Sequence, residues 1–341
     1  MKHSLQDYLV NLVSESAKPT LWVVDESTLP LYENARIPNH VTVLTNRYTP
    51  KNAISPDSKL FVNDFDFSQL NSFERIIYRI SKEKPLVHHC INQSLQHLTD
   101  TGELILIGEK QDGIKSIAKH ALNTFEVDGV TKKQGSFYVT HIGKPTSCDS
   151  ELDTQHYTNL RKINSDGQTF YSKPGIFGWE KVDQGSTLLL KELPRLAKHM
   201  KHINSILDLG CGWGYLMCGT HALNAERRVA TDNNAAAIDA AKKNFEELGL
   251  TVDVVLDDCG SNIKEKFDLI LCNPPFHQGF SVENTLLEKF LKNASRMSRR
   301  STRCLFVVNQ FIPLDNIADK YFSEITLSNK QNGFKVWQLK H

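Results

Sequence analysis

Four consecutive residues, Asn273, Pro274, Pro275 and Phe276, follow an apolar run at 267–272 and are of types that could do chemistry together. A side-chain amide oxygen accepts hydrogen bonds, and a proline ring restricts the direction of the carbonyl group beside it. The oxygens of Asn273 and Pro274 could therefore accept both hydrogens of a planar amine, while Phe276 offers a ring face for stacking. A strand that simply ends at two prolines, with a buried phenylalanine, is the structural alternative.

A second group of candidate residues forms the glycine-rich stretch DLGCGWG at 208–214. Glycine permits a tight turn and lets a ligand approach the backbone closely. The spacing is GxGxG, one residue shorter than the GxGxxG of dinucleotide-binding folds, because Tyr215 stands where the third glycine would fall. The residues that we expect at a ligand here are Asp208, Gly210, Cys211, Gly212 and Gly214.

Acidic residues end the next two strand-like runs. Asp232, followed by Asn233, ends the run at 227–232, and Asp257 and Asp258 end the run at 251–258. A carboxylate at such a position can accept both hydroxyls of a ribose. We therefore predict that Asp232 and Asn233, and one or both of the later acids, contact a cofactor that contains a nucleoside. Helix caps exposed to solvent are the structural alternative.

The elements that must position these residues alternate between strand and helix. Strands are predicted at 203–209, 227–232, 251–258, 266–273 and 303–311, helices at 213–225, 233–249 and 282–297, and a closing hairpin around Gly333. This alternation predicts a parallel, doubly wound sheet with its binding crevice at the carboxyl ends of the strands. All the candidate residues would meet at that edge.

The first half of the chain shows the same alternation of strand and helix less clearly. Strand-like runs occur at 18–26, 40–47, 59–66, 103–113 and 135–143, without a glycine turn after the first run and without an Asn-Pro-Pro. We predict an α/β protein of two tandem doubly wound Rossmann-like domains. Residues 1–150 would form a domain without cofactor motifs, for substrate docking and stability, and residues 151–341 the catalytic domain. The segment 145–175 is polar and turn-rich, and we place the linker near 145–160.

The motifs resemble those of a known enzyme class. The acid-led GxGxG turn resembles the first motif of class I S-adenosylmethionine-dependent methyltransferases, and 273–276 resembles the (N/D)PP(Y/F) motif of those that methylate amino groups. The resemblance implies that the turn holds the amino-acid end of S-adenosylmethionine, that Asp232 binds its ribose, and that Asp257 or Asp258 binds its adenine amine. Residues 273–276 would be catalytic, with Asn273 also at the cofactor.

Two further stretches narrow the resemblance. KPGIFGWEKVDQGSTLLLKEL at 173–193 and NGFKVWQ at 332–338 are similar to sequences of bacterial rRNA guanine-N2 methyltransferases. The small-subunit group of that family implies methylation of guanine 1207 in 16S rRNA, on the 30S subunit. It also implies that Phe177, Asp183 and Ser186 close over the cofactor. Trp213 and Gly178 depart from the family pattern, which has a small residue and a serine there.

Three alternatives stay open at this point. A 23S rRNA guanine-N2 methyltransferase has the same motif, and glutamine methylation of release factors fits less well because Phe276 replaces a tyrosine. From another class, a non-catalytic RNA-binding assembly factor would keep the fold without turnover. A nicotinamide dehydrogenase is disfavoured by the glycine spacing.

Composition agrees with a globular protein rather than a strongly basic nucleic-acid binder. The 341 residues carry a net charge of +1 and are 40% hydrophobic. The seven cysteines include no CxxC pair and are interpreted as reduced and buried, which favours the cytoplasm. We expect no metal site, no membrane contact and a monomer. The arginine-rich tract RMSRRSTR at 296–303 is interpreted as a solvated loop, with an RNA-binding patch as the alternative.

Overall fold

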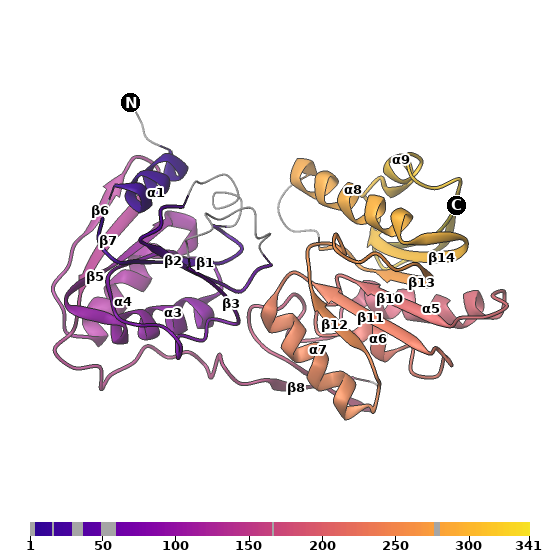
Figure 1. The fold of residues 1–341 in the computed structure, drawn as a ribbon, viewed down its shortest axis with the longest axis horizontal. Coiled ribbons are helices and arrows are strands. Elements are labelled where there is room, and N and C mark those ends of the chain that lie inside the picture. Colours follow the sequence, from indigo (N-terminus) through magenta and orange to yellow (C-terminus); the bar gives the residue numbers. More distant parts are fainter. Residues whose placement is uncertain (1–3, 16, 29–36, 49–58, 166, 276–279) are drawn as a thin grey trace. The chain divides into compact units, whose positions relative to one another are not determined.

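The computed structural model describes residues 4–15, 17–28, 37–48, 59–165, 167–275 and 280–341. The chain divides into two compact units, Met1–Asn159 and Leu160–His341. Figure 1 shows the first unit in indigo to magenta and the second mainly in orange to yellow. Leu152 and Tyr157, near the end of the first unit, are buried in its core.

The second unit is built on a sheet of seven strands among the described residues, in the order β12-β11-β10-β13-β14-β16-β15. Strands β10 to β14 pair in parallel, and β16 is antiparallel to both of its neighbours. The strands are β10 (Ser205–Leu209), β11 (Arg227–Asp232), β12 (Asp253–Leu256), β13 (Phe267–Cys272), β14 (Ser298–Asn309), β15 (Glu324–Gln331) and β16 (Phe334–Lys340). The predicted doubly wound sheet is confirmed.

Helices cover both faces of this sheet. Buried residues of α5 (Gln184–Ala197), α6 (Tyr215–Cys218) and α7 (Ala235–Glu247) pack on one face. Residues of α8 (Phe280–Arg296) and α9 (Leu314–Ala318) pack on the other face. Because both faces are covered, the central strands are buried almost without interruption, as expected for a parallel sheet.

The first unit repeats the same plan, with strand order β3-β2-β1-β4-β5-β7-β6. Its strands are β1 (Thr20–Val24), β2 (Val41–Thr45), β3 (Lys59–Val62), β4 (Phe73–Arg79), β5 (Leu98–Glu109), β6 (Thr131–Gln134) and β7 (Phe137–Gly143). Its helices are α1 (Leu5–Ser14), α3 (Lys84–Gln96) and α4 (Ile114–Thr124), with the short 3-10 helix η2 (Lys110–Asp112). Helix α1 packs on one face of the sheet, and α3 and α4 on the other.

The repeat extends to the register of individual residues. Phe73 of β4 lies opposite Leu98, and after a shift in register Arg75 lies opposite Glu103. In the second unit Phe267 lies opposite Ser298, and after the same shift Leu269 lies opposite Arg303. Counting from the two phenylalanines, Arg79 of the first unit therefore stands where the second unit has Asn273.

Three elements differ from the predictions. Strand β4 was not predicted, because its charged residues interrupt the apolar run FERIIYR. The predicted helix at 213–225 is wrong beyond a single turn: α6 ends at Cys218, and the chain continues through turns that pack Gly219 against Leu190. The segment read as polar and turn-rich contains a hairpin, β8 (Arg161–Ser165) and β9 (Gln168–Ser172).

Candidate functional site

The predicted site residues follow four adjacent parallel strands at the edge where all four end. The glycine turn follows β10, Asp232 ends β11, Asp257 follows β12 and Asn273 follows β13. Since β10 is paired with both β11 and β13, these chain ends are neighbours in space. The carboxyl edge of such a sheet is where doubly wound folds bind ligands.

The glycine turn requires glycine at each of its three positions. Gly210, Gly212 and Gly214 have φ angles of +78°, +53° and +88°, in the left-handed region that other residues avoid. A Cβ atom on Gly214 would lie 2.7 Å from the ring of Phe245, whereas one on Gly212 would meet no heavy atom within 4 Å. Gly214 is thus needed for packing, and Gly212 borders open space.

Asp208 is completely buried beneath this turn. Its Oδ2 accepts the backbone N–H of Met217 at 2.9 Å, which holds the start of α6. Its Oδ1 is buried and has no hydrogen-bond partner in the described part of the chain. Burial raises the pKa of this carboxyl to about 7. Asp208 therefore fixes the turn with one oxygen and keeps the other available for a donor.

Asp232 ties the turn to the second strand. Its Oδ2 accepts the N–H of Gly212 at 2.8 Å, and its Oδ1 accepts the N–H of Asn234 at 2.9 Å. Each carboxylate oxygen can accept a further hydrogen bond, so these contacts leave capacity for a ribose. Asn233, the next residue in the chain, is half-buried. Asn234 caps α7, and its side-chain amide donates to the carbonyl of Gly175.

The two acids after β12 have different surroundings. Both oxygens of the buried Asp257 accept hydrogen bonds from the following turn, from Asp258 N, Ser261 Oγ and both the backbone and the side chain of Asn262. Asp258 instead pairs with Lys289 of α8 and is partly exposed. These hydrogen bonds use both oxygens of Asp257 to hold the turn. Asp258 is therefore the better candidate for binding the adenine amine.

Cys211 and Trp213 complete the turn. Cys211 is buried, and burial raises the pKa of its thiol. The indole N–H of Trp213 donates to the carbonyl of Gly178 at 3.3 Å, and its ring packs on Phe170 and Tyr215. The two departures from the family pattern, Trp213 and Gly178, are therefore bonded to each other and hold the 173–178 loop on the glycine turn.

A buried helix residue that the sequence reasoning missed also supports the turn. Asn244 of α7 accepts the N–H of Tyr171 and donates to the carbonyls of Tyr171 and Trp213, all within 2.8 Å. It joins β9 and the glycine turn to α7. An asparagine on the alanine-rich side of a helix was the available signal, since its amide must find partners when buried.

Asn273 is held in one orientation by the segment upstream of α5. Its side-chain nitrogen donates to Asp183 Oδ2 at 2.8 Å and to Ser186 Oγ at 2.8 Å. Asp183 also caps α5 by accepting the N–H of Ser186 at 2.7 Å. Because a carboxylate only accepts, the amide nitrogen must face Asp183. The oxygen of Asn273 is the end that remains for an acceptor role.

The rest of the predicted catalytic segment is only partly described. Pro274 is buried and Pro275 is exposed. Phe276 lies outside the described residues. Asp183 and Ser186 were expected to close over a cofactor, and the bonds seen here are to Asn273, so they position the amide.

The arginine-rich tract stabilises the opposite edge of the sheet. Arg296 donates to the carbonyls of Gly260 and Ile263, and Arg299 pairs with Asp268 at 3.2 Å. Most of the tract belongs to the start of β14, so the prediction of a loop is wrong, and these arginines are engaged within the fold.

The described residues lack the features of a metal site and of a membrane span. No group of three or more metal-ligating side chains occurs among them. No helix in the described ranges has the length and apolar character that a membrane span requires. All seven cysteines are free thiols, and Cys148 is the one that is not buried, contrary to the prediction.

The site fits S-adenosylmethionine. The open space at Gly212, the unpartnered Asp208 Oδ1 and the acids at the ends of β11 and β12 are suited to a cofactor with an ammonium group, a ribose and an adenine. The fold and this site together define a methyltransferase. The family model for the methyltransferase small domain matches residues 167–338, and that for its N-terminal domain matches residues 23–147.

Comparison with curated proteins gives the particular family. The chain is 30% identical to ribosomal RNA small subunit methyltransferase C of Actinobacillus succinogenes over 80% of this chain and 81% of that protein. It is 28% identical to the protein of the same name from Haemophilus influenzae (strain PittGG), over 78% of this chain and 79% of that one. The chain belongs to the ribosomal RNA small subunit methyltransferase C family, and the resemblance seen in the sequence is confirmed.

A solved structure shares the complete fold. The 16S rRNA N2 G1207 methyltransferase of T. thermophilus, in complex with AdoMet and guanosine, matches with a TM-score of 0.80 and 20% identity. The match covers 98% of this chain and 92% of that one. The tandem arrangement of two methyltransferase-type domains is therefore the fold of this chain as well.

Proposed function

We propose that this chain transfers the methyl group of S-adenosylmethionine to the exocyclic N2 of a guanine in 16S rRNA. The position is guanine 1207, the substrate is the 30S subunit, and the enzyme acts in the cytoplasm as a monomer. The names of its relatives support the substrate. The observation that carries the proposal is the fixed amide of Asn273 beside the glycine turn.

The cofactor site uses the residues that meet at the carboxyl edge. Gly212 would face the amino-acid end of the cofactor, in the turn that Gly210 and Gly214 shape, with Asp208 Oδ1 beneath it. Asp232 would bind the ribose hydroxyls, and Asp258 the adenine amine. When bound, S-adenosylmethionine supplies an electrophilic methyl group on a positively charged sulfur.

Asn273 prepares the acceptor amine. A guanine N2 is planar because its lone pair is delocalised into the ring, so it is a poor nucleophile. Asn273 Oδ1 accepts one N–H and the Pro274 carbonyl accepts the other, which favours a nitrogen whose lone pair points toward the methyl group. Catalysis then depends mainly on positioning, and Asp183 and Ser186 contribute by fixing the amide. After transfer the methylated nitrogen is positively charged and releases one proton to water.

The test is transfer of labelled methyl from S-adenosylmethionine to 30S subunits, 50S subunits and naked rRNAs from cells that lack this protein. The modified nucleoside is then identified by mass. We expect N2-methylguanosine in the 30S sample alone. Label in 50S subunits would instead identify a large-subunit enzyme. Cofactor binding without any transfer would support a non-catalytic assembly factor.

A further inference from the structure

The first unit contains a pocket of about 380 Å³ that the proposed reaction does not use. Pro19 precedes β1, Thr42 lies at the start of β2, Lys59 begins β3 and Phe73 begins β4. The pocket therefore lies at the amino ends of these strands. Cofactor crevices of doubly wound sheets lie at the carboxyl ends, so this pocket is not a remnant cofactor site.

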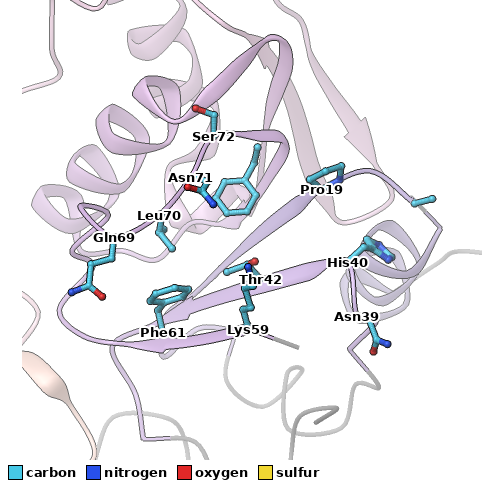
Figure 2. Close-up of a pocket in the computed structure, with 12 residues that line it drawn as sticks. Pro19, Asn39, His40, Thr42, Lys59, Phe61, Gln69, Leu70, Asn71 and Ser72 are labelled. Carbon is cyan, nitrogen blue, oxygen red and sulfur yellow. The ribbon is translucent and has the colours of Figure 1, made fainter. Parts of the chain in front are cut away.

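The walls combine aromatic rings with amide groups. Phe61 and Phe73 contribute rings, and Asn39, Gln69 and Asn71 contribute side-chain amides. Figure 2 shows the segment from Gln69 to Ser72 on one side of the pocket, across from the strand residues Thr42, Phe61 and Lys59. Rings stack on bases, and an amide can both donate to and accept from a base edge.

Two further groups favour a polar, anionic ligand. His40 Nε2 is buried and has no hydrogen-bond partner within the described ranges. The backbone of His40 is already fixed, since its carbonyl accepts the N–H of Thr20 at 3.2 Å. Lys59 is exposed at the pocket and can meet a phosphate. A volume of this size is within the usual range of roughly 300–1,000 Å³ for ligand pockets.

We propose that this pocket binds one unstacked nucleotide of the RNA substrate, with the base on the ring of the half-buried Phe61 and the phosphate at Lys59. The inference rests on the proposed function for the identity of the RNA. It assigns the first unit a specific contact in substrate docking. A free mononucleotide has the same chemistry, and the experiment separates the two sources.

The experiment measures binding of 30S subunits to the full-length protein without S-adenosylmethionine, so that it does not depend on transfer. The first variant combines Gln69→Ala and Asn71→Ala, because both side chains are exposed and make no hydrogen bond with another described residue. Phe61→Ala is the second variant, with a thermal melt to check its fold. Val130→Ala, which truncates an exposed apolar residue of the same unit, is the matched control.

We expect the Kd for 30S subunits to rise about tenfold in Phe61→Ala, as for loss of one stacked base, and to rise in the double variant. The Kd for S-adenosylmethionine should not change, and Val130→Ala should behave as wild type. Wild-type RNA affinity in both pocket variants would overturn the proposal. Tight binding of GMP that depends on Phe61, with RNA binding unaffected, would replace RNA by a free nucleotide and also overturn it.

Absence of methyl transfer to any RNA would refute the proposed function without deciding the pocket. In that case weaker RNA binding by the two pocket variants would still support this inference. The two failures are therefore distinguishable in one set of measurements.

Discussion

At the scale of single residues, the structure determines which end of the Asn273 amide can act. The sequence shows only that an asparagine precedes two prolines. The side-chain nitrogen donates to Asp183 and Ser186, so the oxygen is the end of the amide that can accept a hydrogen bond from the substrate amine. If the side-chain nitrogen of Asn273 faced the substrate amine instead, two hydrogen-bond donors would be opposed and no hydrogen bond could form.

At this scale, the effect of burial on the pKa of the Asp208 carboxyl can also be tested. Burial raises the pKa of its carboxyl to about 7 in the folded protein, against about 3.9 in an unfolded chain. The folded state therefore favours the protonated acid, and this contribution to stability is lost as the pH rises from about 4 through about 7.

We predict that Asp208→Asn, which cannot ionise, raises the Tm of the cofactor-free protein more at pH 8 than at pH 5. The expected difference is a few degrees, because one kcal/mol corresponds to about 2–4 °C for units of this size. Thermal melts of both proteins at the two pH values give the result. Since Asp25 of the first unit has a raised pKa in both proteins, its effect cancels. An equal change at both pH values would show that Asp208 ionises as freely in the folded state as in the unfolded chain.

At the scale of elements, the glycines of the turn differ in whether packing or contact with a ligand requires them. Gly212 and Gly214 share a left-handed backbone, so alanine at either position costs about 1–2 kcal/mol. Of these two glycines, Gly214 alone has a side chain against it, the ring of Phe245.

We predict that Gly212→Ala weakens S-adenosylmethionine binding at least tenfold with a modest loss of stability. Gly214→Ala should lose roughly 1–3 kcal/mol more in unfolding free energy, because its methyl group overlaps the Phe245 ring. Urea unfolding and calorimetric titration of both variants measure the two effects. Unchanged cofactor affinity in Gly212→Ala would mean that the open space beside this residue is not the cofactor site.

Much of the second unit could be predicted from its sequence because periodicity and turn chemistry agree there. The strands that carry Asp208, Asp232 and Asn273 were all located, and so was the end of the sheet where they meet. Strand β4 was missed because Glu74, Arg75 and Arg79 break its apolar pattern. The supports of the site, Asp183 and Asn244, act across 90 and 31 or more residues of chain, and local patterns do not reveal such contacts.

At the scale of the whole molecule, the chain is one architecture used twice, and only the second unit carries the glycine turn and the Asn-Pro-Pro motif. Arg79 stands where the second unit has Asn273, and its guanidinium is paired with Asp112 at 3.4 Å. A guanidinium has no acceptor and cannot hold an amine hydrogen. The first unit also lacks glycines after β1, where the chain continues Asp25-Glu26-Ser27.

We therefore predict that S-adenosylmethionine binds the second unit alone. Hydrogen exchange should slow at the glycine turn, around Asp232 and around Asp258 when the cofactor is added. The corresponding strand ends of the first unit, after β1, β2 and β3 at 25–28, 46–48 and 63–64, should exchange as before. Protection there would indicate a second cofactor site and would contradict the division of roles between the units.

The measurement that tests the central claim most directly compares Asn273→Ala with Asp232→Ala. For each variant, the affinity for S-adenosylmethionine is measured by calorimetry, and single-turnover methyl transfer is measured on 30S subunits with saturating cofactor. We predict that Asn273→Ala keeps its cofactor affinity and loses most of the transfer rate. Asp232→Ala should instead bind the cofactor more weakly, because it loses the carboxylate assigned to the ribose. Equal loss of cofactor affinity in both variants, or normal transfer by Asn273→Ala, would contradict the role assigned to the Asn273 oxygen.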